Sequence, residues 1–61
     1  MPFITVELLK GRTMKQRREF AAALTDLAEQ CLSAAPQSVR IRFIEIDPTE
    51  LARNGKLVSD E

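Results

Sequence analysis

The chain has 61 residues, enough for one small domain, and its nine basic and nine acidic residues leave no net charge. A single cysteine and no histidine exclude an internal disulfide and argue against a zinc site. The balanced charge gives no attraction for nucleic acid or an anionic membrane surface, and no apolar run approaches the roughly 20 residues that span a bilayer. No signal peptide is visible, so we expect a cytoplasmic protein.

So small a domain needs additional stabilisation. A chain of about 60 residues buries only about 60% of its unfolded surface, and such scaffolds usually add disulfides, a metal or association with other chains. Because the composition leaves only association, we expect a homo-oligomer.

The first elements are a strand and a helix. Residues 3–9 alternate apolar and polar side chains, which predicts a strand. Thr13 and Gln16 then form a T-x-x-Q capping box, typical of the start of a helix. From residue 14 to about residue 33, apolar residues recur at steps of three and four, which predicts an amphipathic helix. Its apolar stripe contains Phe20, Leu24, Leu27 and Cys31, so we expect Cys31 to be a core residue.

A second strand and a hairpin follow. Residues 38–46 are predicted to form a strand with Val39, Ile41 and Phe43 on one face and Arg40, Arg42, Ile44 and Ile46 on the other. Residues 47–50 signal a turn, and Asn54-Gly55 signals a second turn before a short strand at 56–58. The order strand, helix, strand predicts a right-handed β-α-β unit of the α/β (α+β) class, with the helix on one sheet face. Another subunit is expected to cover the other face.

Pro2 is the first candidate for chemistry. Initiator methionine is normally removed before a small residue, so we expect loss of Met1 to leave Pro2 with a free secondary amine. A free α-amino group has a pKa of about 8, and an apolar pocket with nearby arginines would lower that pKa towards neutrality. A general base works best with a pKa near the working pH. The alternative is that Pro2 is an ordinary second residue.

Two arginines are candidates for binding an anion. Arg12 follows the first strand, and its guanidinium could reach back towards the start of the sheet to bind a carboxylate. Arg40 begins the second strand. The alternatives are a solvated loop residue for Arg12 and, for Arg40, a surface ion pair with Glu7 or Glu45.

These features together resemble the 4-oxalocrotonate tautomerase family. The resemblance lies in proline after the initiator methionine, an apolar strand, Leu9-Lys10-Gly11-Arg12-Thr13, a long amphipathic helix, Pro36-Gln37-Ser38-Val39-Arg40 and a glycine-containing C-terminal turn. It covers nearly all 61 residues and so implies a single tautomerase-like domain, 1–61, from which Met1 is removed. It also implies a β-α-β subunit with a C-terminal hairpin, assembled as a homohexamer of three dimers.

The resemblance also implies a function. It indicates a cofactor-free and metal-free isomerase that interconverts 2-hydroxy-dienoate and 2-oxo-enoate acids. Pro2 would be the general base and acid, and Arg12 would bind the distal carboxylate. Arg40 of a neighbouring subunit would hold the 2-oxo or 2-hydroxy oxygen and the adjacent carboxylate. The substrate pocket would be lined by Leu9, Ser38 and Leu51, the last standing where the family carries an aromatic residue.

Two other functions stay open at this point. A hydratase- or dehalogenase-like relative would need Glu45 or Glu50 to activate water. A non-catalytic oligomeric module would use the arginines only to hold subunits together, and Pro2 would be incidental.

Overall fold

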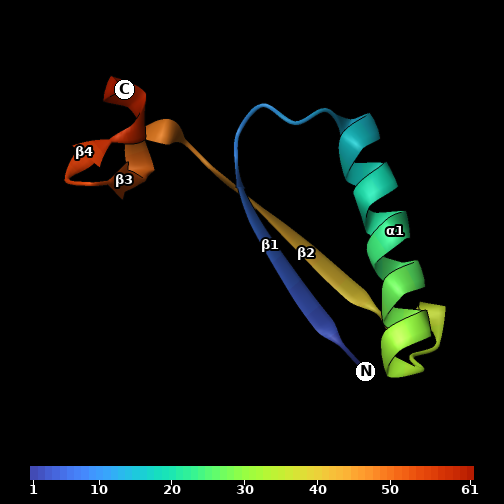
Figure 1. The fold of residues 1–61 in the computed structure, drawn as a ribbon. Helices are drawn as coiled ribbons and strands as arrows, with labels where there is room; N and C mark the ends of the chain where they lie inside the picture. The colour runs from blue at the N-terminus through green and yellow to red at the C-terminus, as the bar shows by residue number, and fades with distance from the viewer.

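The computed structural model describes residues 1–61 and has the predicted strand, helix, strand order (Figure 1). Its elements are β1 (Phe3–Leu9), α1 (Met14–Leu32), β2 (Arg40–Ile46), β3 (Ala52–Arg53) and β4 (Lys56–Leu57). Strands β3 and β4 pair as an antiparallel hairpin. The β-α-β unit and the C-terminal hairpin are therefore confirmed. No helix of the structure is both long and apolar enough to cross a bilayer.

Strand β2 is shorter than the sequence predicted. It begins at Arg40, because the residues before it, Pro36–Ser38, form a single 3-10 turn. The Ser38 amide and hydroxyl both donate to the Ala35 carbonyl oxygen, at 2.9 and 2.8 Å. These bonds hold Ser38 in the turn and away from the strand ladder.

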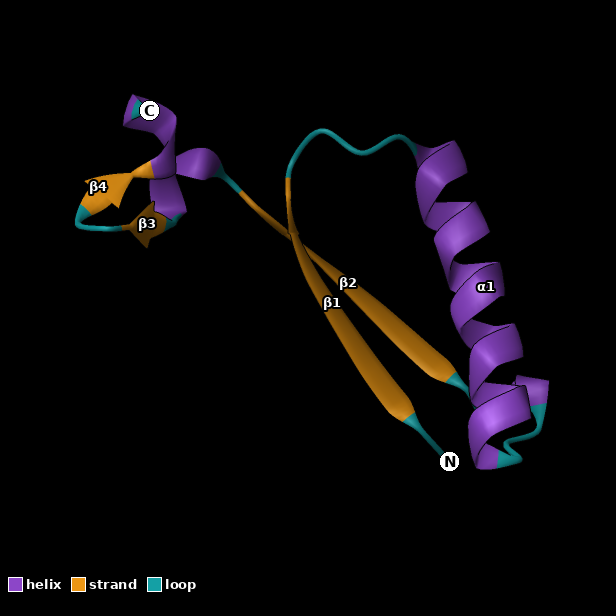
Figure 2. Ribbon diagram, viewed as in Figure 1, coloured by secondary structure: helices purple, strands orange, loops and turns teal.

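Strands β1 and β2 lie parallel, with Phe3 opposite Arg40 and Leu9 opposite Ile46. Since successive side chains of a strand point to opposite faces, this register gives each face a defined set of residues. The face that α1 covers carries Ile4, Val6, Leu8, Ile41, Phe43 and Glu45. The opposite face, here called the open face, carries Phe3, Thr5, Glu7, Leu9, Arg40, Arg42, Ile44 and Ile46. No element of the chain lies on the open face (Figure 2).

Helix α1 starts at the predicted capping box. The Thr13 hydroxyl accepts from the Gln16 amide at 3.1 Å, and the Gln16 side chain accepts from the Thr13 amide at 2.9 Å. These two bonds satisfy amides that have no partner within the helix. The helix ends where Ser33 adopts a left-handed conformation, with φ of 55°.

The predicted apolar stripe of α1 is only partly correct. The residues of the helix that are at least partly buried are Arg17, Ala21, Leu24, Thr25 and Ala28, and Ala28 alone is fully buried. Phe20 and Leu27 remain 47% and 54% exposed, and Cys31 is exposed as well. The expectation that Cys31 is a core residue is therefore wrong for the single chain. A sheet of two strands is too narrow to cover the whole apolar side of the helix.

The single chain leaves more surface exposed than its mass predicts. Its accessible surface is 4807 Å², whereas a compact monomer of 6.9 kDa exposes roughly 4,000 Å². The excess of about 800 Å² equals the share that one partner buries in a standard protein interface. The chain is also thin, with principal extents of 42 × 23 × 13 Å.

The hairpin projects from the β-α-β body as an arm, defined here as residues 48–61 (Figure 1). Asp47 caps the first turn of the arm, because its Oδ1 accepts from the Thr49 amide at 3.0 Å. At the tip, the Arg53 guanidinium binds the Glu61 carboxylate, with Nε donating to Oε2 at 2.7 Å. This ion pair lowers the pKa of Glu61 and raises that of Arg53.

Candidate active site

Pro2 and Arg40 lie together where the sheet begins. Their backbones are joined, because the Arg40 amide donates to the Pro2 carbonyl oxygen at 3.0 Å. The Arg40 guanidinium donates to the Gln37 carbonyl oxygen at 2.6 Å. It pairs with neither Glu7 nor Glu45, so the alternative of a surface ion pair for Arg40 is not seen in the single chain. Its charge is left without a carboxylate partner in the chain.

A hollow of about 360 Å³ opens beside Arg40 at this end of the sheet. It is lined by Phe3, Ile4, Thr5, Arg40, Ile41 and Arg42. Ser38 is adjacent in sequence, but its hydroxyl donates to the Ala35 carbonyl oxygen at 2.8 Å. The hollow therefore combines a largely apolar wall with two guanidinium groups from β2.

Arg12 lies at the other end of the same strand. Gly11 turns the chain with φ of 129°, a conformation that only glycine adopts readily, and Arg12 follows directly. Strand β1 has seven residues, and at about 3.3 Å per residue it separates Pro2 from Arg12 by roughly 20 Å or more. The expectation that Arg12 reaches back to the start of its own sheet is wrong, because the strand is longer than an arginine side chain.

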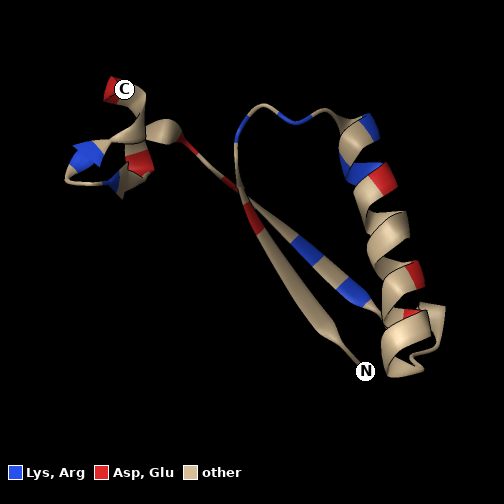
Figure 3. Cartoon of the chain, in the orientation of Figure 1, with Lys and Arg blue, Asp and Glu red and all other residues tan.

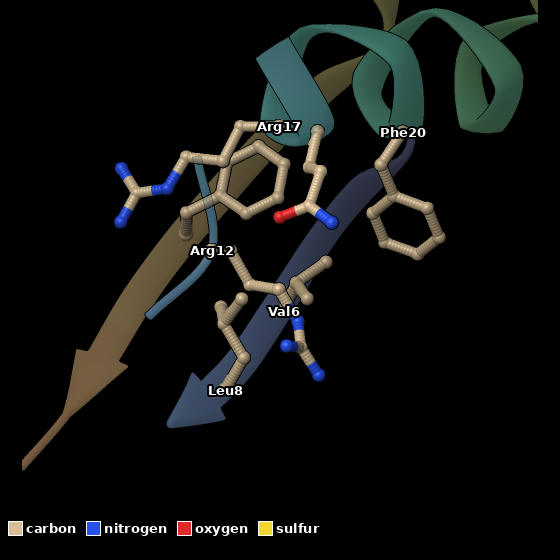
Figure 4. Close-up of a pocket in the computed structure, with 7 residues that line it drawn as sticks. Val6, Leu8, Arg12, Arg17 and Phe20 are labelled. Carbon is tan, nitrogen blue, oxygen red and sulfur yellow. The ribbon is translucent and has the colours of Figure 1, made fainter. Parts of the chain in front are cut away.

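The Arg12 side chain instead lines a cavity of about 330 Å³ between β1 and the first turns of α1. Figure 4 shows its side chain extending beside Val6 and Leu8. The full lining is Val6, Leu8, Arg12, Gln16, Arg17, Phe20 and Phe43. No carboxylate lies within ion-pair distance of Arg12, so this cavity presents an uncompensated cation over an apolar floor.

Arg17 also lines this cavity, although the helical pattern predicts that it lies with Lys15 and Arg18 on the solvated side of the helix; that prediction is wrong for Arg17, whose side chain is only 23% exposed. Its Nη2 lies 2.6 Å from Oε1 of Glu45, and its Cζ lies 5.6 Å from the ring centroid of Phe43. The sequence carried a signal for this contact. Glu45 alternates with the residues of β2 in the same phase as Ile41 and Phe43, so it lies on the sheet face that the helix covers. An acid on a covered face predicts a basic partner on the helix.

The two leucines of the predicted pocket are placed apart in the single chain. Leu9 is half-buried on the open face at the end of β1. Leu51 lies in the arm and is 37% exposed. Its carbonyl oxygen accepts from the Val58 amide at 2.8 Å, which closes the base of the hairpin. The chain therefore does not bring Leu51 to Pro2.

Basic side chains are concentrated in two places on the β-α-β body, as Figure 3 shows. One group lies in the β1–α1 turn and the first helical turns, and the other lies in the first half of β2. The predicted catalytic amine stands at one of these places and a free cation stands at the other. Because these two places lie at opposite ends of β1, the single chain does not bring them together around one small acid. No group of three or more potential metal ligands occurs in the structure.

Comparison with known proteins identifies the fold. The family model described as "Tautomerase enzyme" matches residues 2–61. The chain belongs to the tautomerase family. A "Probable tautomerase" of Bacillus cereus is 30% identical over 61 residues, covering 100% of both chains. The "2-hydroxymuconate tautomerase" of Bacillus subtilis is 30% identical over 60 residues, covering 98% of this chain and 97% of that one.

Solved structures agree with this assignment to the tautomerases. A crystal structure of a 4-oxalocrotonate tautomerase homologue superposes with a TM-score of 0.94 at 33% identity, covering 100% of this chain and 97% of that one. A heterohexameric 4-oxalocrotonate tautomerase of Chloroflexus aurantiacus superposes with a TM-score of 0.91 at 27% identity, covering 98% of this chain and 97% of that one. The predicted resemblance is confirmed, and family membership supports a tautomerase-type activity.

Proposed function

We propose that this tautomerase interconverts 2-hydroxy-dienoate and 2-oxo-enoate acids without a cofactor, using the amine of Pro2 after removal of Met1. The observation that carries the proposal is the placement of Pro2 and Arg12 at opposite ends of one strand, in a chain whose family is established. Related tautomerases described as a heterohexamer and as an asymmetric trimer support self-association of this chain.

Assembly is proposed to complete the site. The outer edge of β1 has no strand partner in the chain, so its backbone groups can pair with a second copy. An antiparallel pairing of two β1 edges places the start of one strand beside the end of the other. The two-fold arrangement thus brings Arg12 of one copy to Pro2 of the next. Arg40 of the same chain lies beside Pro2; further copies, in a hexamer of three dimers, are proposed to supply the Arg40 that holds the substrate and to cover the open face.

The reaction follows from these placements. The neutral Pro2 amine removes a proton from the substrate, and the resulting dienolate carries negative charge on its oxygen. Arg40 stabilises that charge as it develops, while Arg12 holds the distal carboxylate. The protonated Pro2 then returns the proton to a different atom of the conjugated system, so the amine is regenerated. Leu9, Ser38 and Leu51 are proposed to line the substrate pocket in the assembly.

The structure disfavours the hydratase alternative for one of its two acids. Glu45 lies on the helix-covered face, opposite to Arg40, and its carboxylate is bound to Arg17 at 2.6 Å. A carboxylate engaged in this way is poorly placed to activate water beside Arg40. Measuring water addition to an unsaturated acid tests the remaining candidate, Glu50.

The proposed role of Pro2 is tested with two forms of the protein distinguished by intact mass. The first form begins at Pro2, and the second retains one residue attached to it, so its proline nitrogen is an amide. We expect the first form to ketonise 2-hydroxymuconate, followed by ultraviolet absorbance, and the second to lose at least about 100-fold in kcat, typical of a lost general base. Equal activity of the two forms, or full activity of Pro2→Ala, would refute the proposal.

Mixing tests whether the site is shared between copies. Arg12→Ala chains keep a working Pro2, whereas chains with a blocked Pro2 keep a working Arg12. Each assembly alone should be nearly inactive. When the two chains are unfolded and refolded together, we expect activity to return, because some sites then combine both intact residues. Mixtures that stay inactive despite forming mixed assemblies would show that one chain supplies both groups.

A further inference from the structure

We propose that the Arg17–Glu45 ion pair positions Arg12, so that Arg17 and Glu45 set the preference of the site for a dicarboxylate. The inference rests on the role proposed above for Arg12 at the distal carboxylate. Neither side chain is proposed to touch the substrate.

The ion pair ties the first turns of α1 to the end of β2. Arg17 lies one turn beyond the helix start, and its amide donates to the Thr13 carbonyl oxygen at 3.1 Å. Its guanidinium lies 2.6 Å from Glu45 and 5.6 Å from the centre of the Phe43 ring. Because Arg17 lines the same cavity as Arg12, any shift of this helical turn changes where the Arg12 guanidinium lies.

A second ion pair holds the other side of the turn that joins β1 to α1. The Lys10 amide donates to the Ile46 carbonyl oxygen at 3.0 Å, and its Nζ lies 3.3 Å from Oδ2 of Asp47. Lys10 and Arg17 therefore attach the turn to the same end of β2 from its two sides. Arg12 lies between these attachments, next to a glycine that otherwise leaves the backbone free to move.

The surroundings of Arg17 indicate that its ion pair orients the neighbouring turn more than it stabilises the fold. Its side chain is 23% exposed, whereas that of Glu45 is 41% exposed, so water competes for the pair. Its Nε is buried and has no hydrogen-bond partner, which costs free energy that an apolar side chain would not incur. Arginine fixes the orientation of this contact, because a planar guanidinium can lie over Phe43 and bind Glu45 at the same time.

A purely electrostatic role for the pair predicts a different pattern. If Arg17 acted only as a second cation, removing it would weaken dicarboxylate binding, and removing the charge of Glu45 would strengthen that binding. If the pair positions Arg12, both changes weaken dicarboxylate binding alike. Glu45→Gln therefore distinguishes the two roles by the sign of its effect.

The experiment compares binding of muconate, a dicarboxylate without the reactive hydroxyl, with that of sorbate, which has one carboxylate on the same conjugated chain. Chemical-shift titrations use the assembled protein that begins at Pro2. We expect the preference for muconate over sorbate to fall about tenfold in Arg17→Met and in Glu45→Gln, as small misplacements of binding groups do. Sorbate affinity, which does not need Arg12, should stay unchanged and show that each variant is folded.

A matched control lies on the outer side of the same helical turns. Lys15 and Glu19 are 3.9 Å apart and 83% and 67% exposed. Lys15→Met and Glu19→Gln make the same charge changes without loosening the Arg12 turn, so they should leave the preference unchanged. Arg17→Lys keeps the charge and loses the planar group, and it should show an intermediate loss.

The outcomes separate this inference from the proposed function. An unchanged preference in Glu45→Gln, a stronger one, or a wild-type protein that does not prefer muconate overturns the positioning role. A wild-type protein that prefers muconate through Arg17 and Glu45, but does not ketonise 2-hydroxymuconate, supports the positioning role and refutes the proposed function alone.

Discussion

The exposed apolar stripe of α1 gives a quantitative test of self-association. Phe20, Leu27 and Cys31 lie seven and four residues apart, so they share one flank of the helix beside the sheet-facing residues. Leu27 is 54% exposed in the single chain, although it is one of the largest apolar side chains of the helix. We expect this flank to pack against a second copy and therefore expect Leu27→Ala to weaken assembly.

The magnitude follows from the exposed fraction. Burying a leucine side chain completely contributes about 1.5–3 kcal/mol, so burying the remaining half contributes about 1 kcal/mol or slightly more. A two-fold contact loses this contribution from both copies, which gives about 2–3 kcal/mol. At 1.4 kcal/mol per tenfold, the concentration at which the assembly dissociates should rise about thirtyfold to hundredfold.

Sedimentation velocity over a dilution series measures that concentration. Glu29→Ala is the control, because it places alanine at an exposed position of the same helix on the side away from the stripe. Its dissociation concentration should match that of the wild type. If Leu27→Ala also dissociates at the wild-type concentration, this flank faces solvent and our assignment of the interface is refuted.

Two further predictions concern the turns that hold the site in place. Hydrogen bonds from Thr49 and the contact with Lys10 lower the pKa of Asp47, so its stabilising contribution is complete above the usual aspartate pKa of about 3.9 and is lost as the pH falls through the lowered value. The difference in urea midpoint between wild type and Asp47→Asn should therefore be larger at pH 7 than at pH 3, and an equal difference would contradict this. Gly11→Ala should lower stability by about 1–3 kcal/mol, because φ of 129° strains any residue with a side chain while no atom lies within 4 Å of the added carbon. Thermal unfolding measures this loss, and an unchanged midpoint would show that the turn relaxes without cost.

Local sequence signals predicted the elements well. The capping box at Thr13 and Gln16 gave the start of α1, and the Asn54-Gly55 turn gave the hairpin. Both signals depend on bonds within a few residues, which a sequence contains in full. The predicted start of β2 at residue 38 is wrong, because Ser38 bonds to the Ala35 carbonyl oxygen and so belongs to the 3-10 turn.

The site was harder to predict, because it depends on the distance between the two ends of a strand and on which sheet face each strand residue points to. Arg12 could be recognised as a candidate anion ligand, but its separation from Pro2 follows only from the observed length and direction of β1. The sequence predicts Cys31 in the core, because it recurs in register with the apolar residues of the helix. How much of that stripe is covered depends on the width of the sheet, which periodicity does not reveal.

The parallel pairing of β1 with β2 has a consequence for the order of folding events. The contacts that close this sheet join residues far apart in sequence, as do Lys10 and Asp47, which are 37 positions apart in a chain of 61. No local hairpin can nucleate such a sheet, because the entropy of closing the intervening loop must be lost before the first ladder bond forms. Helix α1 needs only neighbouring residues, so we expect it to form early and the sheet to form last.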